Sequence, residues 1–160
     1  MGAKIDKACE WCLSIAFDDS HGYDQANRWG PDYDCSSLLI QGWENAGVPV
    51  KTNGASYTGN MYQVFTQCGF SDVTMLVNKS SGAGIKKGDI LLNIENHVAM
   101  SIGNGLIVQA SINELGEAVG GMSGDQTKEE IHVRSYYDYP WDRILRFAED
   151  SLEIVRFIPT

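Results

Sequence analysis

The chain has 160 residues, of which 43% are hydrophobic, so it is long enough for one domain with a sizeable core. Twelve basic and 21 acidic residues give a net charge of −9, and no basic patch stands out, which excludes nucleic acid as an expected partner. The first residues carry no long apolar run, so we expect no signal peptide, no transmembrane segment and no membrane partner. We expect a single domain over residues 1–160, with its core over about 4–147 and a terminal strand or the start of a linker over 148–160.

The first predicted helix covers residues 4–17, where apolar residues recur at helical spacing. Cys9 and Cys12 lie inside this pattern as a C-x-x-C pair. A zinc site would need a second pair at matching spacing, and the sequence has none. Packing within the helix is therefore the favoured interpretation of both cysteines.

A second predicted helix begins near Asp34 or Cys35, after a loop rich in Asp, Gly and Asn, and ends at Gly47. Cys35 would then lie at the helix N-terminus, where the helix dipole and free backbone N–H groups favour a thiolate over a thiol. Most lone cysteines are packing residues. Because Cys35 follows turn residues and opens the helix, we interpret it as a nucleophile.

A third helix is predicted over residues 57–68, and short runs rich in Leu, Ile and Val follow it. Gly103-Asn104-Gly105 predicts a hairpin turn. The expected extended ranges are 70–77, 89–94, 98–102, 106–110, 131–137, 143–147 and, as a strand or linker, 152–158. Residues 113–128 are polar and glycine-rich, as in an ordered loop or lid. Helices followed by an antiparallel meander predict an α+β fold with a segregated sheet.

His97 lies six residues before Gly103 and Gln109 six residues after it, so we expect the two to be near-opposite on adjacent strands. Equal parity about the turn places both side chains on one face of adjacent strands. A polar side chain beside an imidazole can fix its tautomer, which leaves the other ring nitrogen to take a proton from Cys35. His21 lies in a loop and His132 lies beside Arg134 in a late strand, so we interpret His97 as the base and Gln109 as its orienter.

The pattern resembles the NlpC-like cell-wall cysteine peptidases and their phage-encoded relatives. Those proteins carry an upstream tyrosine, an Asp-Cys-Ser, a Lys- or Pro-Gly-Asp at the start of a strand, a His-Val before a Gly-Asn-Gly turn, and a third polar residue. The corresponding residues here are Tyr23 or Tyr33, Asp34-Cys35-Ser36, Lys87-Gly88-Asp89, His97-Val98, Gly103-Asn104-Gly105 and Gln109. The match spans roughly Ile5 to Phe147, and the segment 120–134 is similar to the phage subgroup.

The resemblance implies a papain-like fold, with N-terminal helices packed on a segregated antiparallel sheet, in a single catalytic domain. It implies that Cys35 is the nucleophile, His97 the base and Gln109 the orienter, a position that is often a histidine in the family. The residues expected to bind substrate are Tyr23, Trp29, Tyr33, Asp34 and Ser36. Further candidates for the walls of the substrate groove are Asp24, Asp32, Asp125 and Trp141. No metal or other cofactor is expected, since no Asp- and Asn-dense loop has EF-hand spacing.

The implied function is a peptidoglycan hydrolase that cuts amide bonds of bacterial stem peptides, as in the catalytic domain of a phage lysin. Two bonds remain open: the γ-D-glutamyl bond to a diamino acid, and the bond between N-acetylmuramic acid and L-alanine. An acyltransferase and a non-catalytic wall-binding module are alternatives on the same fold. The expected partner is peptidoglycan, reached by holin-like lysis or as part of a phage particle, and a wall-binding domain beyond Thr160 is consistent with the chain's ending.

Overall fold

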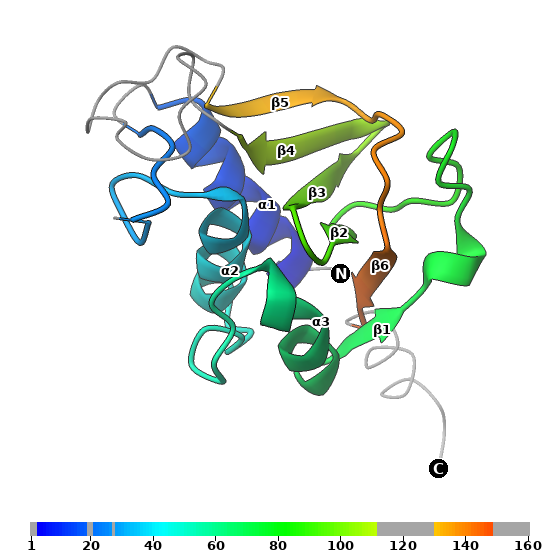
Figure 1. Cartoon of the computed structure of the whole chain (residues 1–160), viewed down its shortest axis with the longest axis horizontal. Helices are drawn as coiled ribbons and strands as arrows, with labels where there is room; N and C mark the ends of the chain where they lie inside the picture. Colours follow the sequence, from blue (N-terminus) through cyan, green and yellow to red (C-terminus); the bar gives the residue numbers. More distant parts are fainter. Residues whose placement is uncertain (1–2, 19–20, 27, 112–129, 149–160) are drawn as a thin grey trace.

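The computed structural model describes residues 3–18, 21–26, 28–111 and 130–148. Three helices pack against a six-stranded antiparallel sheet (Figure 1). The helices are α1 (Ala3–Ala16), α2 (Cys35–Asn45) and α3 (Thr58–Gln67), with a 3-10 turn η1 (Thr74–Leu76). The strands are β1 (Phe70–Asp72), β2 (Ile90–Asn93), β3 (His97–Gly103), β4 (Leu106–Ala110), β5 (Ile131–Ser135) and β6 (Arg143–Phe147). The predicted α+β class, with helices before a segregated sheet, is confirmed.

The strands lie in the order β1-β6-β2-β3-β4-β5. The meander predicted from the sequence therefore holds for β2 to β5 but not for β6, which returns across the sheet and pairs with the free edge of β2. The segment predicted as extended over 70–77 is a strand only as far as Asp72. The Asp72 carboxylate accepts a hydrogen bond from the Thr74 backbone N–H at 3.0 Å, and this side chain-to-backbone bond starts the 3-10 turn.

Apolar residues fill both faces of the sheet. The larger cluster lies between the helices and one face, and includes Leu38, Trp43 and Val98. A smaller cluster on the other face includes Leu91, Ile107 and Trp141. Strand residues alternate between the two clusters, as the two-residue period of a strand requires.

Cys9 and Cys12 are both free thiols with no exposed surface, and they belong to the larger cluster. Burial raises the pKa of Cys9 to about 11 and that of Cys12 well above its usual range. Both side chains pack against α2 or the sheet, since Cys12 Sγ lies 3.8 Å from the Leu38 carbonyl oxygen and Cys9 Sγ 3.8 Å from that of Ser101. The prediction that this pair is packed core is confirmed.

A buried ion pair joins the start of β2 to β6. Asp89 has no exposed surface, and its carboxylate accepts hydrogen bonds from Arg146 at 2.9 and 2.7 Å and from the Lys86 backbone N–H at 2.8 Å. Asp89 belongs to the Lys-Gly-Asp that carried part of the resemblance. The pair explains why a charged residue stands at the head of a buried strand.

Three expectations lie outside the described residues: the loop or lid over 113–128 with Asp125, the resemblance of 120–129 to phage proteins, and the last strand or linker over 152–158. In the part of the chain that the structure describes, no helix is long and apolar enough to cross a membrane.

Candidate active site

Helix α2 begins at Cys35, where the sequence predicted it. Asp34 is the N-cap: its Oδ1 accepts a hydrogen bond from the Ser37 backbone N–H at 2.8 Å, and Ser37 Oγ accepts one from the Asp34 N–H at 2.9 Å. This reciprocal capping box satisfies two backbone donors that a helix start otherwise leaves without partners. The position of Cys35 is therefore fixed by its own local sequence.

Arg28 holds the same helix start from the preceding loop. Its guanidinium donates to both carboxylate oxygens of Asp34, at 2.7 and 3.2 Å, and to Ser36 Oγ at 2.6 Å. The Arg28 and Asp34 side chains are only 15% and 11% exposed, so the pair is largely removed from water. Sequence analysis missed Arg28, although it is the only Lys or Arg between residues 18 and 34.

The Cys35 thiol lies in a desolvated position. Burial, followed by the nearby Asp34 carboxylate, raises the pKa of Cys35 to about 11. Hydrogen bonds from the backbone N–H groups of Val98 and Ser36 and the charge of Arg28 act in the other direction but are smaller. The prediction that the helix start makes Cys35 a thiolate is therefore wrong for the free protein, because burial and a neighbouring carboxylate outweigh the helix terminus.

The hydrogen bond from the Val98 backbone N–H brings Cys35 to the start of β3, where His97 is the residue before Val98 in the chain. His97 Nε2 lies 2.8 Å from Gln109 Oε1. The register, with Met100 opposite Val108, makes His97 and Gln109 diagonal neighbours on one face rather than the near-opposite pair we expected, and long side chains span that distance. Because the amide oxygen faces Nε2, that nitrogen carries the proton and Nδ1 presents its lone pair.

Gln109 is itself held by two further side chains. Its Nε2 lies 3.0 Å from His132 Nε2, and its Oε1 accepts a hydrogen bond from the Tyr137 hydroxyl at 3.1 Å. Gln109 and His132 are direct partners in the β4–β5 register. Sequence analysis set His132 aside and did not consider Tyr137, because the twenty residues between β4 and β5 leave the register unreadable from sequence.

Aromatic rings enclose His97 on the side away from the helices. The Trp141 ring stacks on the imidazole with centroids 5.9 Å apart, and the Tyr139 ring meets it edge-on at 5.6 Å. Burial lowers the pKa of His97, and the nearby His132 adds to that effect, whereas the hydrogen bond to Gln109 raises it. His97 is therefore neutral at pH 7, which a general base requires.

The tyrosines and tryptophan predicted to bind substrate lie in different surroundings. Tyr23 is buried close to Cys35, and burial raises its pKa to about 12, with the charge of Cys35 as a further cause. Tyr33 packs edge-on against Trp11 at 5.5 Å, inside the core. Trp29 is exposed, between Arg28 and Lys51 at 4.7 and 4.4 Å. Of the three, Tyr23 is the one whose pKa Cys35 affects, and the substrate contacts of all three stay predictions.

The polar residues predicted beside the groove are largely engaged within the protein. Asp34 and Ser36 are buried and face Arg28, as described above. Asp24 and Asp32 are buried as well, and their carboxylates accept hydrogen bonds from the backbone N–H groups of Ala26 and Gly22. All four side chains are therefore held by contacts within the loop before α2 or at the start of that helix.

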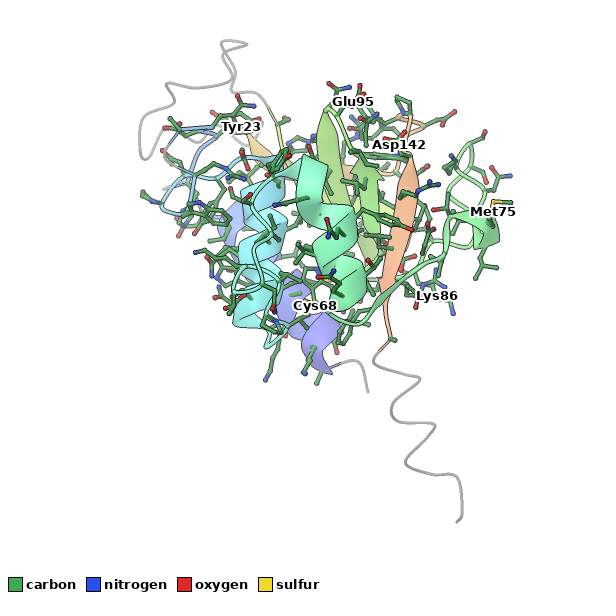
Figure 2. The ribbon with its side chains drawn as sticks, turned by 60° about the horizontal axis from the view of Figure 1, so that its bottom comes forward. Tyr23, Cys68, Met75, Lys86, Glu95 and Asp142 are labelled. Atoms are coloured by element: carbon green, nitrogen blue, oxygen red, sulfur yellow. The ribbon has the colours of Figure 1, made fainter. Side chains whose placement is uncertain are left out.

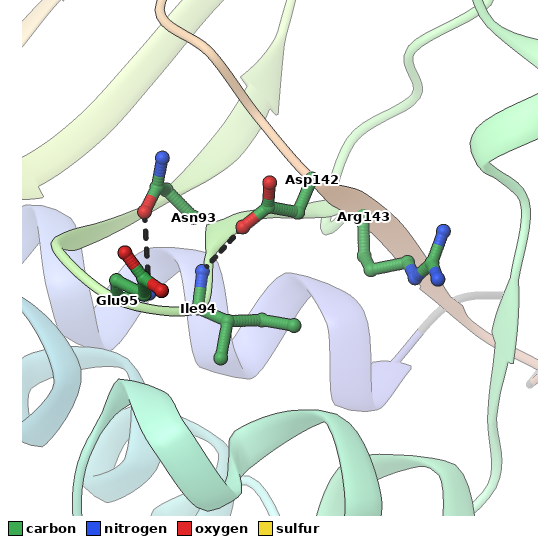
Figure 3. Close-up of a pocket in the computed structure, with 5 residues that line it drawn as sticks. All are labelled: Asn93, Ile94, Glu95, Asp142 and Arg143. Carbon is green, nitrogen blue, oxygen red and sulfur yellow. Dashed lines mark hydrogen bonds between the residues drawn. The ribbon is translucent and has the colours of Figure 1, made fainter.

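An open pocket of about 500 Å³ lies at the β2–β3 turn (Figure 3), and one of its lining residues, Asn93, is the direct partner of His97 in the β2–β3 register. Asn93 and Ile94 line it with Glu95, Asp142 and Arg143. Asp142 accepts a hydrogen bond from the Ile94 N–H at 2.8 Å, while the Glu95 carboxylate is exposed and has no bonding partner among the described residues. Figure 2 shows Glu95 and Asp142 at the same end of the molecule as Tyr23.

No cluster of three His, Cys, Asp or Glu side chains that could hold a metal ion occurs among residues 3–18, 21–26, 28–111 and 130–148.

The solved structures that are similar to the chain include two with NlpC or P60 in their names. NlpC1 from Trichomonas vaginalis is 18% identical, and the match covers 92% of this chain and 45% of that chain with a TM-score of 0.50. The P60 domain of antigen MAP1204 from M. avium subspecies paratuberculosis is 16% identical, with coverages of 89% and 96% and a TM-score of 0.51. The chain has the NlpC/P60 fold. The papain-like fold implied by the resemblance is thereby confirmed.

A family model described as an endolysin-like domain matches residues 107–155. No curated protein matches the sequence. This match covers less than a third of the chain, which is thus similar to endolysin-like domains over that segment, and the solved structures show the NlpC/P60 fold. The chain spans less than half the length of NlpC1 and nearly the whole length of the P60 domain.

Proposed function

We propose that the chain is a peptidoglycan hydrolase that cuts an amide bond of the stem peptide with Cys35 as its nucleophile. The observation that carries this proposal is the meeting of Cys35, at the start of α2, with the start of β3, where His97 is held by Gln109. The NlpC/P60 fold and the endolysin-like match support the cell wall as the place of action.

The raised pKa of Cys35 and the lowered pKa of His97 set the order of the proton transfers. The resting site holds a thiol and a neutral imidazole. As Cys35 Sγ attacks the amide carbonyl, His97 Nδ1 takes the thiol proton, and Gln109 Oε1 stabilises the resulting imidazolium through Nε2. The backbone N–H of Cys35, at the open end of α2, donates to the oxyanion.

Collapse of the tetrahedral intermediate breaks the C–N bond, and the His97 imidazolium gives its proton to the leaving amine. Sγ then carries the acyl group as a thioester. His97, neutral again, removes a proton from water as the water attacks the thioester carbonyl. The carboxylic acid leaves, and Sγ recovers its proton from His97.

We favour the γ-D-glutamyl bond to a diamino acid over the muramoyl–L-alanine bond. The Glu95 carboxylate, which has no partner among the described residues, lines the pocket at the β2–β3 turn, where it can pair with the free amine of a diamino acid. The muramoyl–L-alanine bond offers no such amine next to the scissile position. The amidase remains the second candidate because the endolysin-like match fits it equally well.

The test is to incubate purified Gram-positive peptidoglycan with the protein and with Cys35→Ala, and to identify the new ends by mass spectrometry. A free diamino-acid amine that appears only with the intact cysteine supports the endopeptidase, and a free L-alanine amine indicates the amidase. Peptide exchange onto an added amine without release of acid would indicate an acyltransferase. Binding to the wall with no new ends from any wall type would contradict hydrolysis and favour the binding module.

The place of action follows from the same proposal. We expect the protein to reach the wall after holin-like lysis or as part of a phage particle, and we expect peptidoglycan to be its partner. Immunodetection in lysates and in purified particles from a producing culture separates these two routes.

A further inference from the structure

Gln109 sits between two histidines, and its amide group has one oxygen and one nitrogen to offer them. Oε1 faces His97 at 2.8 Å and Nε2 faces His132 at 3.0 Å. The residue is 3% exposed, so water does not replace either partner. A nitrogen of histidine that carries a proton needs the amide oxygen, and one that presents a lone pair needs the amide nitrogen.

We infer that Gln109 allows only one of the two histidines to carry a proton on the nitrogen that faces it, and that His132 is thereby a positioning residue for the catalytic base. This inference rests on the proposed function of His97 as the base. When His132 presents its lone pair, Oε1 is left for His97, whose proton is then on Nε2 and whose Nδ1 is free to take the Cys35 proton.

In the opposite arrangement, with the Gln109 amide turned over, every hydrogen bond still has a donor and an acceptor, but the site is inactive. A protonated His132 draws Oε1 toward itself, and the amide turns over. Nε2 of Gln109 then donates to Nε2 of His97, which must move its proton to Nδ1. His97 with a proton on Nδ1 has no lone pair for the Cys35 thiol. Tyr137 tolerates both arrangements, because a hydroxyl both donates and accepts.

Catalysis itself selects the first arrangement. The imidazolium that forms during attack carries protons on both ring nitrogens, so it needs Oε1 at Nε2. The Nε2 of His132, which faces Gln109, must therefore carry no proton throughout the reaction. Electrostatics act in the same direction, because His132 lowers the pKa of His97.

The groups that bear on His132 come from several elements. Among the described residues, Arg134 lies two positions away on the same face of β5, Glu130 immediately precedes the strand, and Tyr137 follows it. Gln109 faces it from β4 and His97 lies beyond Gln109 on β3. Arg134 stacks on the Tyr137 ring at 3.9 Å, so its cation is next to the network and disfavours a second positive charge there.

The test compares His132→Lys, which can only donate to Gln109, with His132→Gln, which can accept and can never be charged. We expect His132→Lys to lower kcat at least ~100-fold, as when a triad histidine is held in the wrong tautomer. We expect His132→Gln to keep kcat within ~10-fold. Ser135→Lys is the control, because it adds the same charge on an exposed position of β5 and should change kcat less than ~2-fold.

Nitrogen NMR of the labelled protein reads the tautomer of His97 directly, without any substrate. The wild type at pH 7 should show the proton on Nε2, and His132→Lys should move it to Nδ1. The acid limb of the pH profile should be steeper than one proton in the wild type and have the slope of one proton in His132→Gln.

The outcomes separate this inference from the proposed function. A His97 proton on Nε2 in folded His132→Lys, or full activity of that variant, overturns the inference. If the His97 tautomers are as predicted but the protein releases no new ends from peptidoglycan, the inference about Gln109 and His132 holds and the proposed hydrolase function is contradicted. Circular dichroism and thermal unfolding of each variant identify one that fails to fold, in which case His132→Gln and the wild-type tautomer decide.

Discussion

The two halves of the candidate site are built in opposite ways. The nucleophile half, around Cys35, is assembled from Arg28, Asp34, Ser36 and Ser37, which lie within ten residues of one another in the sequence. The base half joins His97, Gln109, His132 and Tyr137 from three strands and the segment after β5. Local capping chemistry fixes the first half, and sheet register fixes the second.

Because the two halves are built differently, we expect substitutions in them to affect different measured properties. A helix start held by a capping box and a buried ion pair contributes to stability, so damage there should appear in unfolding as well as in rate. A hydrogen-bond relay behind the base contributes to orientation, so damage there should appear in kcat and in the pH profile. Substitutions that depart from this division would show that the two halves are coupled more closely than their construction indicates.

The largest effect is expected from Arg28→Ala in the nucleophile half. The change leaves the Asp34 carboxylate and the Ser36 hydroxyl buried without their cation, so we expect the free energy of unfolding to fall by about 3 kcal/mol in urea titrations. Since Arg28 lowers the pKa of Cys35, its loss should also slow alkylation of the thiol at pH 8.

Lys87→Ala is the matched control for Arg28→Ala. It removes an ion pair with Asp6 that has a similar 2.8 Å distance but side chains about half exposed, and such pairs contribute less than about 1 kcal/mol. Equal losses in the two variants would show that the Arg28 pair is no more than a surface contact.

In the base half, Gln109→Leu should lower kcat about 100-fold with a smaller loss of stability, because it removes the partner of His97 Nε2. The wild type should lose activity as the pH falls through the lowered pKa of His97, below 6.5, since only the neutral imidazole accepts the thiol proton. The hydrogen bond to Gln109 raises that pKa, so its loss should move the acid limb to still lower pH.

Gln109→His tests whether the base half needs a hydrogen-bonding side chain rather than glutamine itself. The resemblance includes a histidine at this position in many relatives, and such a ring can also hold the His97 tautomer. We expect the rate to recover at least tenfold over Gln109→Leu. A Gln109→Leu variant with an unchanged pH profile and rate would contradict the orienting role altogether.

The same division explains what could be read from the sequence. The α2 start at Asp34-Cys35, the buried C-x-x-C in α1 and the hairpin that joins His97 to Gln109 depend on local signals, and the structure has each of them. The pairing of β6 with β2 and that of His132 with Gln109 depend on register across long connections, which no local pattern encodes. The thiol's raised pKa was missed because burial is a tertiary property.

The smallest effect is expected at the pocket beside the β2–β3 turn. Glu95→Gln removes an exposed carboxylate that has no partner in the described part of the chain, so stability should stay within about 0.5 kcal/mol, as for an ordinary surface substitution. If Glu95 pairs with the amine of a diamino acid, KM should rise about threefold with kcat unchanged, because binding is lost equally from the ground and transition states. The rise should shrink at high salt, which screens exposed charges, and it should vanish on a substrate whose side-chain amine is acetylated. A change in kcat alone would instead place Glu95 among the residues that act on the reacting atoms. If neither kcat nor KM changed, the pocket would not bind the substrate, and the muramoyl–L-alanine bond would be favoured.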